Sequence, residues 1–198
     1  VEAAARYFNF NKDAHKIHVE DGRYFLKTVT EQYDVVVMDA FSGDTVPGHL
    51  MSLEAFKLVK KTLLPSGVLT INFIAGNRQG DKPVPASLYR TLKTVFKNVD
   101  VYAHSNYIQK KTSIANMTFV AYDHQVDINE GELLISIAPV YPPLEKEVQT
   151  ILTRRISFEN GPFLFTDDYN PVDFYDAGVH EKLREGALRS GDMKIIVY

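Results

Sequence analysis

The 198-residue sequence contains no cysteine. This absence excludes disulfide bonds, thiolate zinc sites and thiol nucleophiles, and it is compatible with any redox compartment. The 22 lysine and arginine residues are evenly spread and outnumbered by 25 acidic residues, so there is no basic stripe of the kind that binds nucleic acid. No apolar run approaches the roughly 20 residues that a membrane-spanning helix needs. We therefore expect a cytoplasmic domain that contacts neither nucleic acid nor, in this segment, a membrane.

Several catalytic signatures are also missing. The six histidines show no spacing typical of a metal site, so no metal is expected. Ser42 lies in Phe41-Ser42-Gly43 rather than in the Gly-x-Ser-x-Gly elbow of a hydrolase. The glycine-containing segment 76–80 has neither the dinucleotide nor the P-loop fingerprint, and we interpret it as a loop. A nicotinamide-dependent dehydrogenase is therefore the least favoured of the enzyme classes considered.

The sequence does have strands that alternate with amphipathic helices, and 45% of its residues are hydrophobic, enough for the core of one domain. Apolar patterns predict strands at 16–20, 33–39, 68–74 and 98–103. Helical spacing predicts helices at 23–27, 52–64 and 86–96. This alternation implies right-handed crossovers and a mainly parallel sheet.

Three segments refine this prediction. Residues 33–39 form a continuous β-branched run, typical of a central strand that is covered on both faces. Residues 116–122 follow the preceding strand after a loop too short for a helical crossover, so we expect them to pair antiparallel at the sheet edge. Beyond residue 123 the pattern changes to short helical pieces and a turn-rich stretch at 159–170, with a final helix near 179–189. We predict that residues 1–198 form part of one domain, with a sheet core at 1–123 and a C-terminal extension at 124–198.

Acidic residues follow the predicted strands, where ligands bind in open parallel sheets. Asp21 precedes Gly22, and the pair could bind an amine next to a flat ring or could form a plain turn. Asp39 ends the most hydrophobic strand, where an apolar wall would make its carboxylate a better proton acceptor. A charge at that position is costly without a use, which favours a functional role.

Two more acidic positions have open alternatives. Asp44 lies in a loop that could bring its carboxylate and that of Asp39 around one cationic amine, but it could equally be solvated or cap a turn. The sequence Asp167-Asp168-Tyr169-Asn170-Pro171 could close over the same pocket or could simply terminate a segment.

Together these segments resemble the spermidine synthase-like aminopropyltransferases, a branch of the class I methyltransferase fold. The resemblance lies in Asp21-Gly22, in Tyr-Asp-Val-Val-Val-Met-Asp-Ala-Phe at 33–41, in Leu-Pro-Ser-Gly-Val-Leu at 64–69 and in Leu-Phe-Thr-Asp-Asp-Tyr-Asn-Pro-Val-Asp at 164–173. It implies an α/β, Rossmann-like fold with a mainly parallel sheet and a late antiparallel edge strand. It also implies that the first strands, with their glycine-rich loop, lie before Val1, so that the chain is a fragment.

The resemblance further implies roles for individual residues. An adenosyl co-substrate, either decarboxylated S-adenosylmethionine or S-adenosylmethionine, would contact Asp21, Gly22 and Ala40. Asp39 would be the general base that deprotonates an amine such as putrescine. The amine itself would contact Asp44, Asp168 and Tyr169. No metal is required, and the family suggests a homodimer.

The chain departs from the better-known family members at two places. Asp39 and Asp44 are separated by four residues, whereas those members have a compact Asp-Ser-Ser-Asp-Pro loop. Their Gln and Glu after the next strand are replaced by the segment that begins at Asn72. Two alternatives therefore remain: a methyltransferase that uses S-adenosylmethionine, and a catalytically silent module that binds nucleosides.

Overall fold

A computed structural model describes residues 1–40, 47–76, 83–103, 114–125, 150, 153–172 and 174. Its helices are α1 (Glu2–Phe8), α2 (Gly22–Thr28), α3 (Leu53–Thr62) and α4 (Pro83–Val95), with short 3-10 turns η1 (Lys12–Ala14) and η2 (Gly48–Leu50). Its strands are β1 (Tyr33–Met38), β2 (Leu63–Gly76), β3 (Asn98–Ala103), β4 (Ile114–Tyr122) and β5 (Arg155–Ile156). Within these described ranges, no helix is long and apolar enough to cross a membrane.

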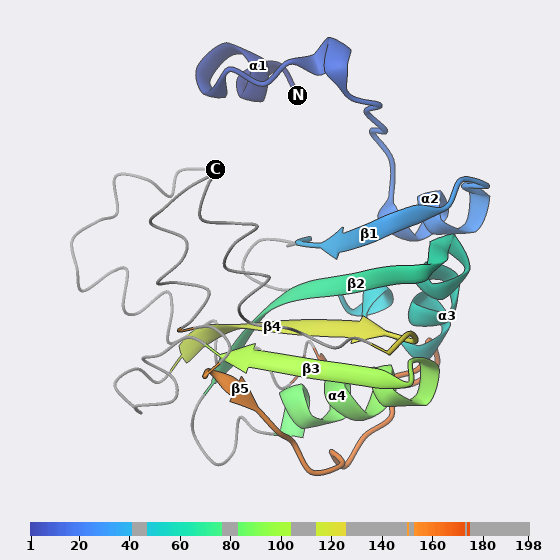
Figure 1. Ribbon diagram of the computed structural model, residues 1–198, viewed down its shortest axis with the longest axis vertical. Coiled ribbons are helices and arrows are strands. Elements are labelled where there is room, and N and C mark those ends of the chain that lie inside the picture. The colour runs from blue at the N-terminus through green and yellow to red at the C-terminus, as the bar shows by residue number, and fades with distance from the viewer. Residues whose placement is uncertain are drawn as a thin grey trace.

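The strands form one mixed sheet in the order β1-β2-β4-β3-β5 (Figure 1). Strands β1 and β2 are parallel neighbours, whereas β4 runs antiparallel to both β2 and β3. Strands β1, β2 and β3 therefore point the same way, as the alternation with helices predicts. An α/β structure with a late antiparallel strand is confirmed.

The predicted edge position of that antiparallel strand is wrong. Strand β4 lies inside the sheet, where Phe119 pairs with Ile71 of β2 and with Val101 of β3. The crossover through α4 places β3 one strand away from β2, and β4 fills the space between them. This position satisfies the backbone hydrogen bonds on both sides of β4, which an edge position would leave half unpaired.

The predicted central position of the β-branched strand is also wrong in the described part of the chain. Strand β1 is at the end of the sheet and pairs only with β2 there. Its Val35 and Val37 are 55% and 65% exposed, while Val36 and Met38 pack into the core from the other face. Hydrophobicity alone does not distinguish a strand with two neighbours from a strand with one.

The strand predicted at 16–20 is not formed. Residues 16–19 have no regular secondary structure, because no described strand lies beside them to supply hydrogen bonds. The helix predicted after them is confirmed as α2. Preceding them, α1 has no buried residue and lies apart from the sheet (Figure 1).

The hydrophobic core lies between one face of the sheet and helices α3 and α4. Phe56 of α3 is fully buried, and Phe73 of β2 meets Phe119 of β4 edge to face at 6.0 Å. Phe165 and Val172 from the C-terminal extension are also fully buried in this cluster. These two described residues of the extension therefore pack in the same core as the sheet and helices.

Candidate functional site

Asp39 directly follows β1 and is linked by amide side chains to the next two strands of the sheet. Its Oδ1 accepts a hydrogen bond from Asn72 Nδ2 of β2 at 3.0 Å. Asn72 Oδ1 in turn accepts a hydrogen bond from Asn116 Nδ2 of β4 at 3.2 Å. The Asn72 amide is thus fixed in one orientation, and Oδ2 of Asp39 has no hydrogen bond to any described residue.

Asp39 is exposed, so the apolar wall predicted around it does not enclose the residue. Side chains alternate along a strand, so Met38 enters the core and Asp39 points to the opposite face. On that face its neighbours are the exposed Val37 and the half-buried Asn72. The Asp39 carboxylate is therefore open to solvent on that face.

A pocket of about 290 Å³ lies between α2, β1 and α3 and brings three predicted site residues together. Its lining is mostly apolar and includes Gly22, Asp39 and Ala40. A Cβ atom added to Gly22 would meet only the Leu50 side chain, at an ordinary 3.5 Å. Glycine is therefore not sterically required there, but it leaves the pocket wall flat.

Asp21, next to this pocket, is the N-cap of α2. Its Oδ1 accepts the backbone N–H of Tyr24 at 3.0 Å, and its Oδ2 lies 3.0 Å from Nε2 of His49. These contacts, the Tyr24 amide foremost, hold the pKa of Asp21 below its ordinary value. The carboxylate is therefore ionised at neutral pH, and both of its oxygens are engaged.

The second acidic cluster forms a turn at 166–170. The Thr166 N–H donates to the Tyr169 carbonyl, and the Tyr169 N–H donates to the Thr166 hydroxyl, each at 3.0 Å. Asp168 is exposed, and the half-exposed Tyr169 packs its ring against Phe163. Neither Asp168 nor Tyr169 lines the pocket beside Asp39.

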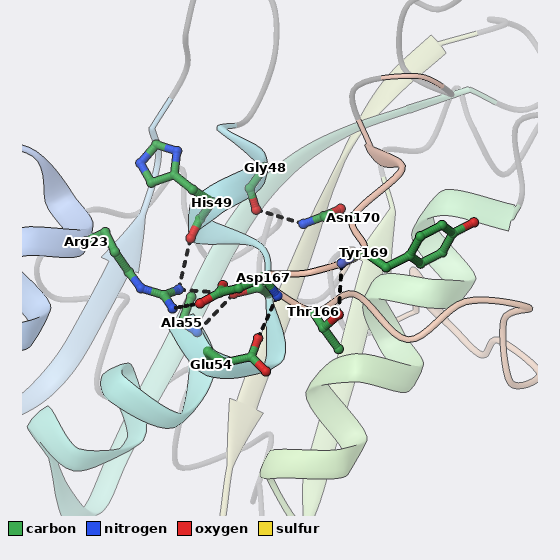
Figure 2. A network of polar contacts seen from close by, with 10 residues as sticks. Arg23, Gly48, His49, Glu54, Ala55, Thr166, Asp167, Tyr169 and Asn170 are labelled. Carbon is green, nitrogen blue, oxygen red and sulfur yellow. Dashed lines mark hydrogen bonds and ion pairs between the residues drawn. The ribbon is translucent and has the colours of Figure 1, made fainter.

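Asp167 is the acidic residue of this turn that makes specific contacts. Arg23 Nη2 pairs with Asp167 Oδ2 at 2.6 Å, and the Ser52 hydroxyl donates to Asp167 Oδ1 at 2.5 Å. Arg23 Nη1 also donates to the Ser52 hydroxyl and to the His49 carbonyl, each at 3.0 Å (Figure 2). The Arg23 side chain is only 11% exposed and Ser52 is buried, whereas the Asp167 side chain is 48% exposed.

Two further contacts hold the turn against η2 and α3. The Asp167 N–H donates to Glu54 Oε2 at 2.9 Å, and Asn170 Nδ2 donates to the Gly48 carbonyl at 2.7 Å (Figure 2). A second cavity of about 290 Å³ lies here. It is lined by Arg23, Lys27, Gly48, His49, Ser52, Thr166, Asp167 and Asn170.

The sequence patterns did not indicate that Arg23, Ser52 or Asn72 are site residues. Arg23 directly follows the Asp21-Gly22 pair, and Ser52 precedes an apolar helical pattern as an N-cap would, so both left a weak signal. Asp44 lies outside the described residues. Among the residues that the structure describes, no group of three histidine or acidic side chains could hold a metal ion.

The chain is similar in sequence to known polyamine aminopropyltransferases. A polyamine aminopropyltransferase of Vibrio vulnificus is 25% identical over 87% of the chain, and the match covers 57% of that relative. A probable polyamine aminopropyl transferase of Bifidobacterium longum is 32% identical over 49% of the chain and 21% of its own length. The chain thus spans little more than half of the first of these relatives.

Two solved structures have the same fold at low identity. A probable spermidine synthase from Corynebacterium glutamicum superposes with a TM-score of 0.57 at 19% identity, over 82% of the chain and 61% of that protein. Human methyltransferase-like protein 13, solved in complex with SAH, gives a TM-score of 0.52 at 20% identity, over 82% of the chain and 71% of that protein. The fold is therefore the Rossmann-like class I methyltransferase fold. Since the Spermine/spermidine synthase domain matches residues 2–126, well over half of the chain, the chain belongs to the spermine/spermidine synthase family.

Proposed function

We propose that this chain carries part of the active site of an aminopropyltransferase. The enzyme would move an aminopropyl group from decarboxylated S-adenosylmethionine to an amine such as putrescine. The observation that carries the proposal is the meeting of Gly22, Asp39 and Ala40 at one pocket, with Asp21 beside it. Family membership and the polyamine aminopropyltransferases among the relatives support it.

Asp39 would act as the general base. Its Oδ1 is held by Asn72, which leaves Oδ2 to take a proton from the attacking ammonium group. The neutral amine nitrogen then forms a bond to the carbon next to the sulfonium while the carbon–sulfur bond breaks. The bonding pair remains on sulfur, and methylthioadenosine leaves. Rate would come from the positioning of two substrates and the removal of one proton.

Asp21 and Gly22 would hold the adenosyl group. An adenine amino group can donate to Asp21, and the flat wall at Gly22 with the apolar side chains of Leu26 and Leu50 suits an aromatic ring. Asp21 Oδ1 already accepts a hydrogen bond from Tyr24, so Oδ2 would receive the adenine amino group. That oxygen is the one that His49 contacts, and a carboxylate oxygen has lone pairs for two donors.

Calorimetric titration of the full-length protein tests this proposal. The ligands are methylthioadenosine, S-adenosylmethionine and its decarboxylated form, each titrated into the wild-type protein and into Asp21→Ala. We expect binding of methylthioadenosine or of the decarboxylated form, and at least tenfold weaker binding by the variant, because a hydrogen bond to a charged acceptor is lost. If the wild-type protein binds none of the three ligands, the proposal fails.

Methyl transfer is the second candidate, and Asn72 is the observation that favours it. Its amide is engaged on both sides, by Asp39 and by Asn116, so it does not offer a substrate amine the contacts of the Gln and Glu in better-known members. Product analysis separates the candidates, since aminopropyl transfer releases methylthioadenosine and methyl transfer releases S-adenosylhomocysteine. Ligand binding without either product would indicate a silent nucleoside-binding module.

A cytoplasmic location and a homodimer stay predictions. Sedimentation of the full-length protein measures the oligomeric state.

A further inference from the structure

The Arg23 guanidinium joins three segments that are distant in the sequence. It pairs with Asp167 in the C-terminal turn, and it donates to the Ser52 hydroxyl before α3 and to the His49 carbonyl in η2. The side chain is almost buried. A buried charge is costly unless its hydrogen bonds are satisfied, so this position of Arg23 depends on all three partners.

Both the backbone carbonyl and the side-chain ring of His49 make polar contacts. Its carbonyl accepts the Arg23 hydrogen bond, and its ring Nε2 lies 3.0 Å from Asp21 Oδ2. The preceding carbonyl, that of Gly48, accepts from Asn170 of the same C-terminal turn. The turn at 166–170 therefore fixes the η2 backbone at two adjacent peptide groups, and that backbone directs the imidazole at Asp21.

We propose that the turn at 166–170 sets the affinity of the Asp21 site for its nucleoside, and that Arg23 is the positioning residue that carries the effect through His49. The inference rests on the proposed function in that the ligand is an adenosyl compound. With η2 fixed, the imidazole holds the Asp21 carboxylate in one orientation, ready to accept the adenine amino group. A preorganised acceptor binds more tightly than a mobile one.

The backbone amides of η2 give a direct readout of this link. The Leu50 N–H donates to the Pro47 carbonyl and the Met51 N–H donates to the Gly48 carbonyl, each at 2.9 Å. Their exchange with solvent hydrogen reports how firmly η2 is held, because such an amide exchanges when its hydrogen bond opens. If Arg23 and the turn fix η2, loss of the Arg23 contacts should speed the exchange of both amides.

The experiment measures amide hydrogen exchange of Leu50 and Met51 by NMR in the full-length protein. The exchange rates and the calorimetric affinity for methylthioadenosine are compared in wild type, Arg23→Met, Arg90→Met, His49→Gln and the variant that combines Arg23→Met with His49→Gln. Arg90 is the matched control, because it also anchors the C-terminal segment, through the Gly161 and Pro162 carbonyls at 3.0 and 3.2 Å. It makes no contact with His49 or Asp21 among the described residues.

We expect Arg23→Met to speed the exchange of both amides and to weaken methylthioadenosine binding roughly tenfold, the size of one lost charged hydrogen bond. In the His49→Gln background, Arg23→Met should weaken binding much less, because the two residues act on Asp21 in series. Arg90→Met should change neither readout, even where it lowers the melting temperature. Arg23→Lys should fall between wild type and Arg23→Met, because an ammonium group can pair with Asp167 but cannot reproduce the planar fork. Asp167→Asn, which removes the charge that pairs with Arg23, should shift both readouts in the same direction as Arg23→Met.

Unchanged amide exchange in Arg23→Met and Asp167→Asn overturns the inference, as do equal effects of Arg23→Met and Arg90→Met. These results would mean that Arg23 only stabilises the fold. If the exchange speeds up as expected but the wild-type protein binds no methylthioadenosine, the link from Arg23 to η2 is supported and the proposed function fails. The two failures are therefore distinguishable.

Discussion

Asp39 is the residue on which the proposed chemistry depends most directly. One of its carboxylate oxygens is held by Asn72, so the side chain is oriented although it is exposed. The sequence pattern predicted Asp39 as a general base, on the expectation that an apolar wall would make its carboxylate a better proton acceptor. The structure instead provides orientation through an amide on the neighbouring strand, which no local sequence pattern reveals, because Asn72 is 33 residues away.

Asp39→Asn should lower the turnover number by about 10² or more, the usual contribution of a general base. Affinity for methylthioadenosine should stay within about twofold of wild type, because the substitution preserves shape and the adenosyl group contacts other residues. Asp34→Asn, an exposed acid on the same strand, is the control and should leave both constants unchanged. Steady-state kinetics with calorimetry provides the comparison, and an active Asp39→Asn enzyme would exclude this base.

Tyr122 provides a pH-dependent test of the far end of the sheet. Its hydroxyl donates to Asp100 at 2.8 Å, and Asp100 also pairs with Arg155 of β5. Burial, followed by this hydrogen bond, raises the pKa of Tyr122 to about 12. The pKa of a tyrosine side chain in an unfolded chain is about 10. Above that pH the unfolded chain loses a proton that the folded chain keeps, so this contribution to stability is complete below about pH 10 and is lost as the pH rises toward about 12.

Denaturant unfolding at pH 9, 10 and 11 should therefore show a steeper loss of stability in wild type than in Tyr122→Phe, which has no proton to lose. Tyr7→Phe, which changes an exposed ring on α1, should follow wild type. Equal slopes for wild type and Tyr122→Phe would contradict the prediction.

Most of the described helices and strands could be predicted from local sequence patterns. Which strands pair with each other in the sheet could not. Apolar spacing predicted the ends of α3, α4 and β3 to within three residues. This is possible because an element that buries one face shows a regular apolar pattern over a short stretch of sequence. The internal position of β4 and the terminal position of β1 depend on which strands lie beside them, and that choice involves residues far along the chain. The same limit explains why Asp168 was chosen over Asp167: adjacent residues in a turn point in different directions, and only the docked turn decides which of them meets Arg23.

Ser52 joins α3 to the C-terminal turn and shows how one residue can serve two elements. Its hydroxyl accepts the Ala55 N–H as the N-cap of α3, accepts a hydrogen bond from Arg23 and donates to Asp167. Ser52→Ala removes all three contacts and should lower the free energy of unfolding by at least about 2–3 kcal/mol, the sum of a lost cap and a lost charged hydrogen bond. Thr94→Ala removes a single exposed hydrogen bond on α4 and should cost under about 1 kcal/mol. Thermal unfolding of both variants is the measurement, and equal losses would contradict this account.

At the scale of the whole molecule, the described segment 153–172 packs against the sheet and helices through their common core. Phe165 is fully buried, and Gly161 lies so close to α4 that a Cβ atom there would be 2.2 Å from the Ser87 backbone nitrogen. Phe165→Ala should lower the free energy of unfolding by about 3–5 kcal/mol. Phe174→Ala, at a position that is 77% exposed, is the matched control and should cost less than about 1 kcal/mol. Chemical denaturation distinguishes the two outcomes.

The closure of the core by Phe165 and Val172 also has a consequence for synthesis. The contacts of Arg23 and Ser52 with Asp167 span 144 and 115 residues, so the N-terminal half must wait for the segment that completes it. Long sequence separations slow folding, and a nascent chain emerges at only about 5–20 residues per second. While the ribosome translates the intervening residues, the apolar surface of α3 and β2 stays uncovered for several seconds. This protein should therefore engage cotranslational chaperones, and its yield should depend on the rate of translation through residues 126–165.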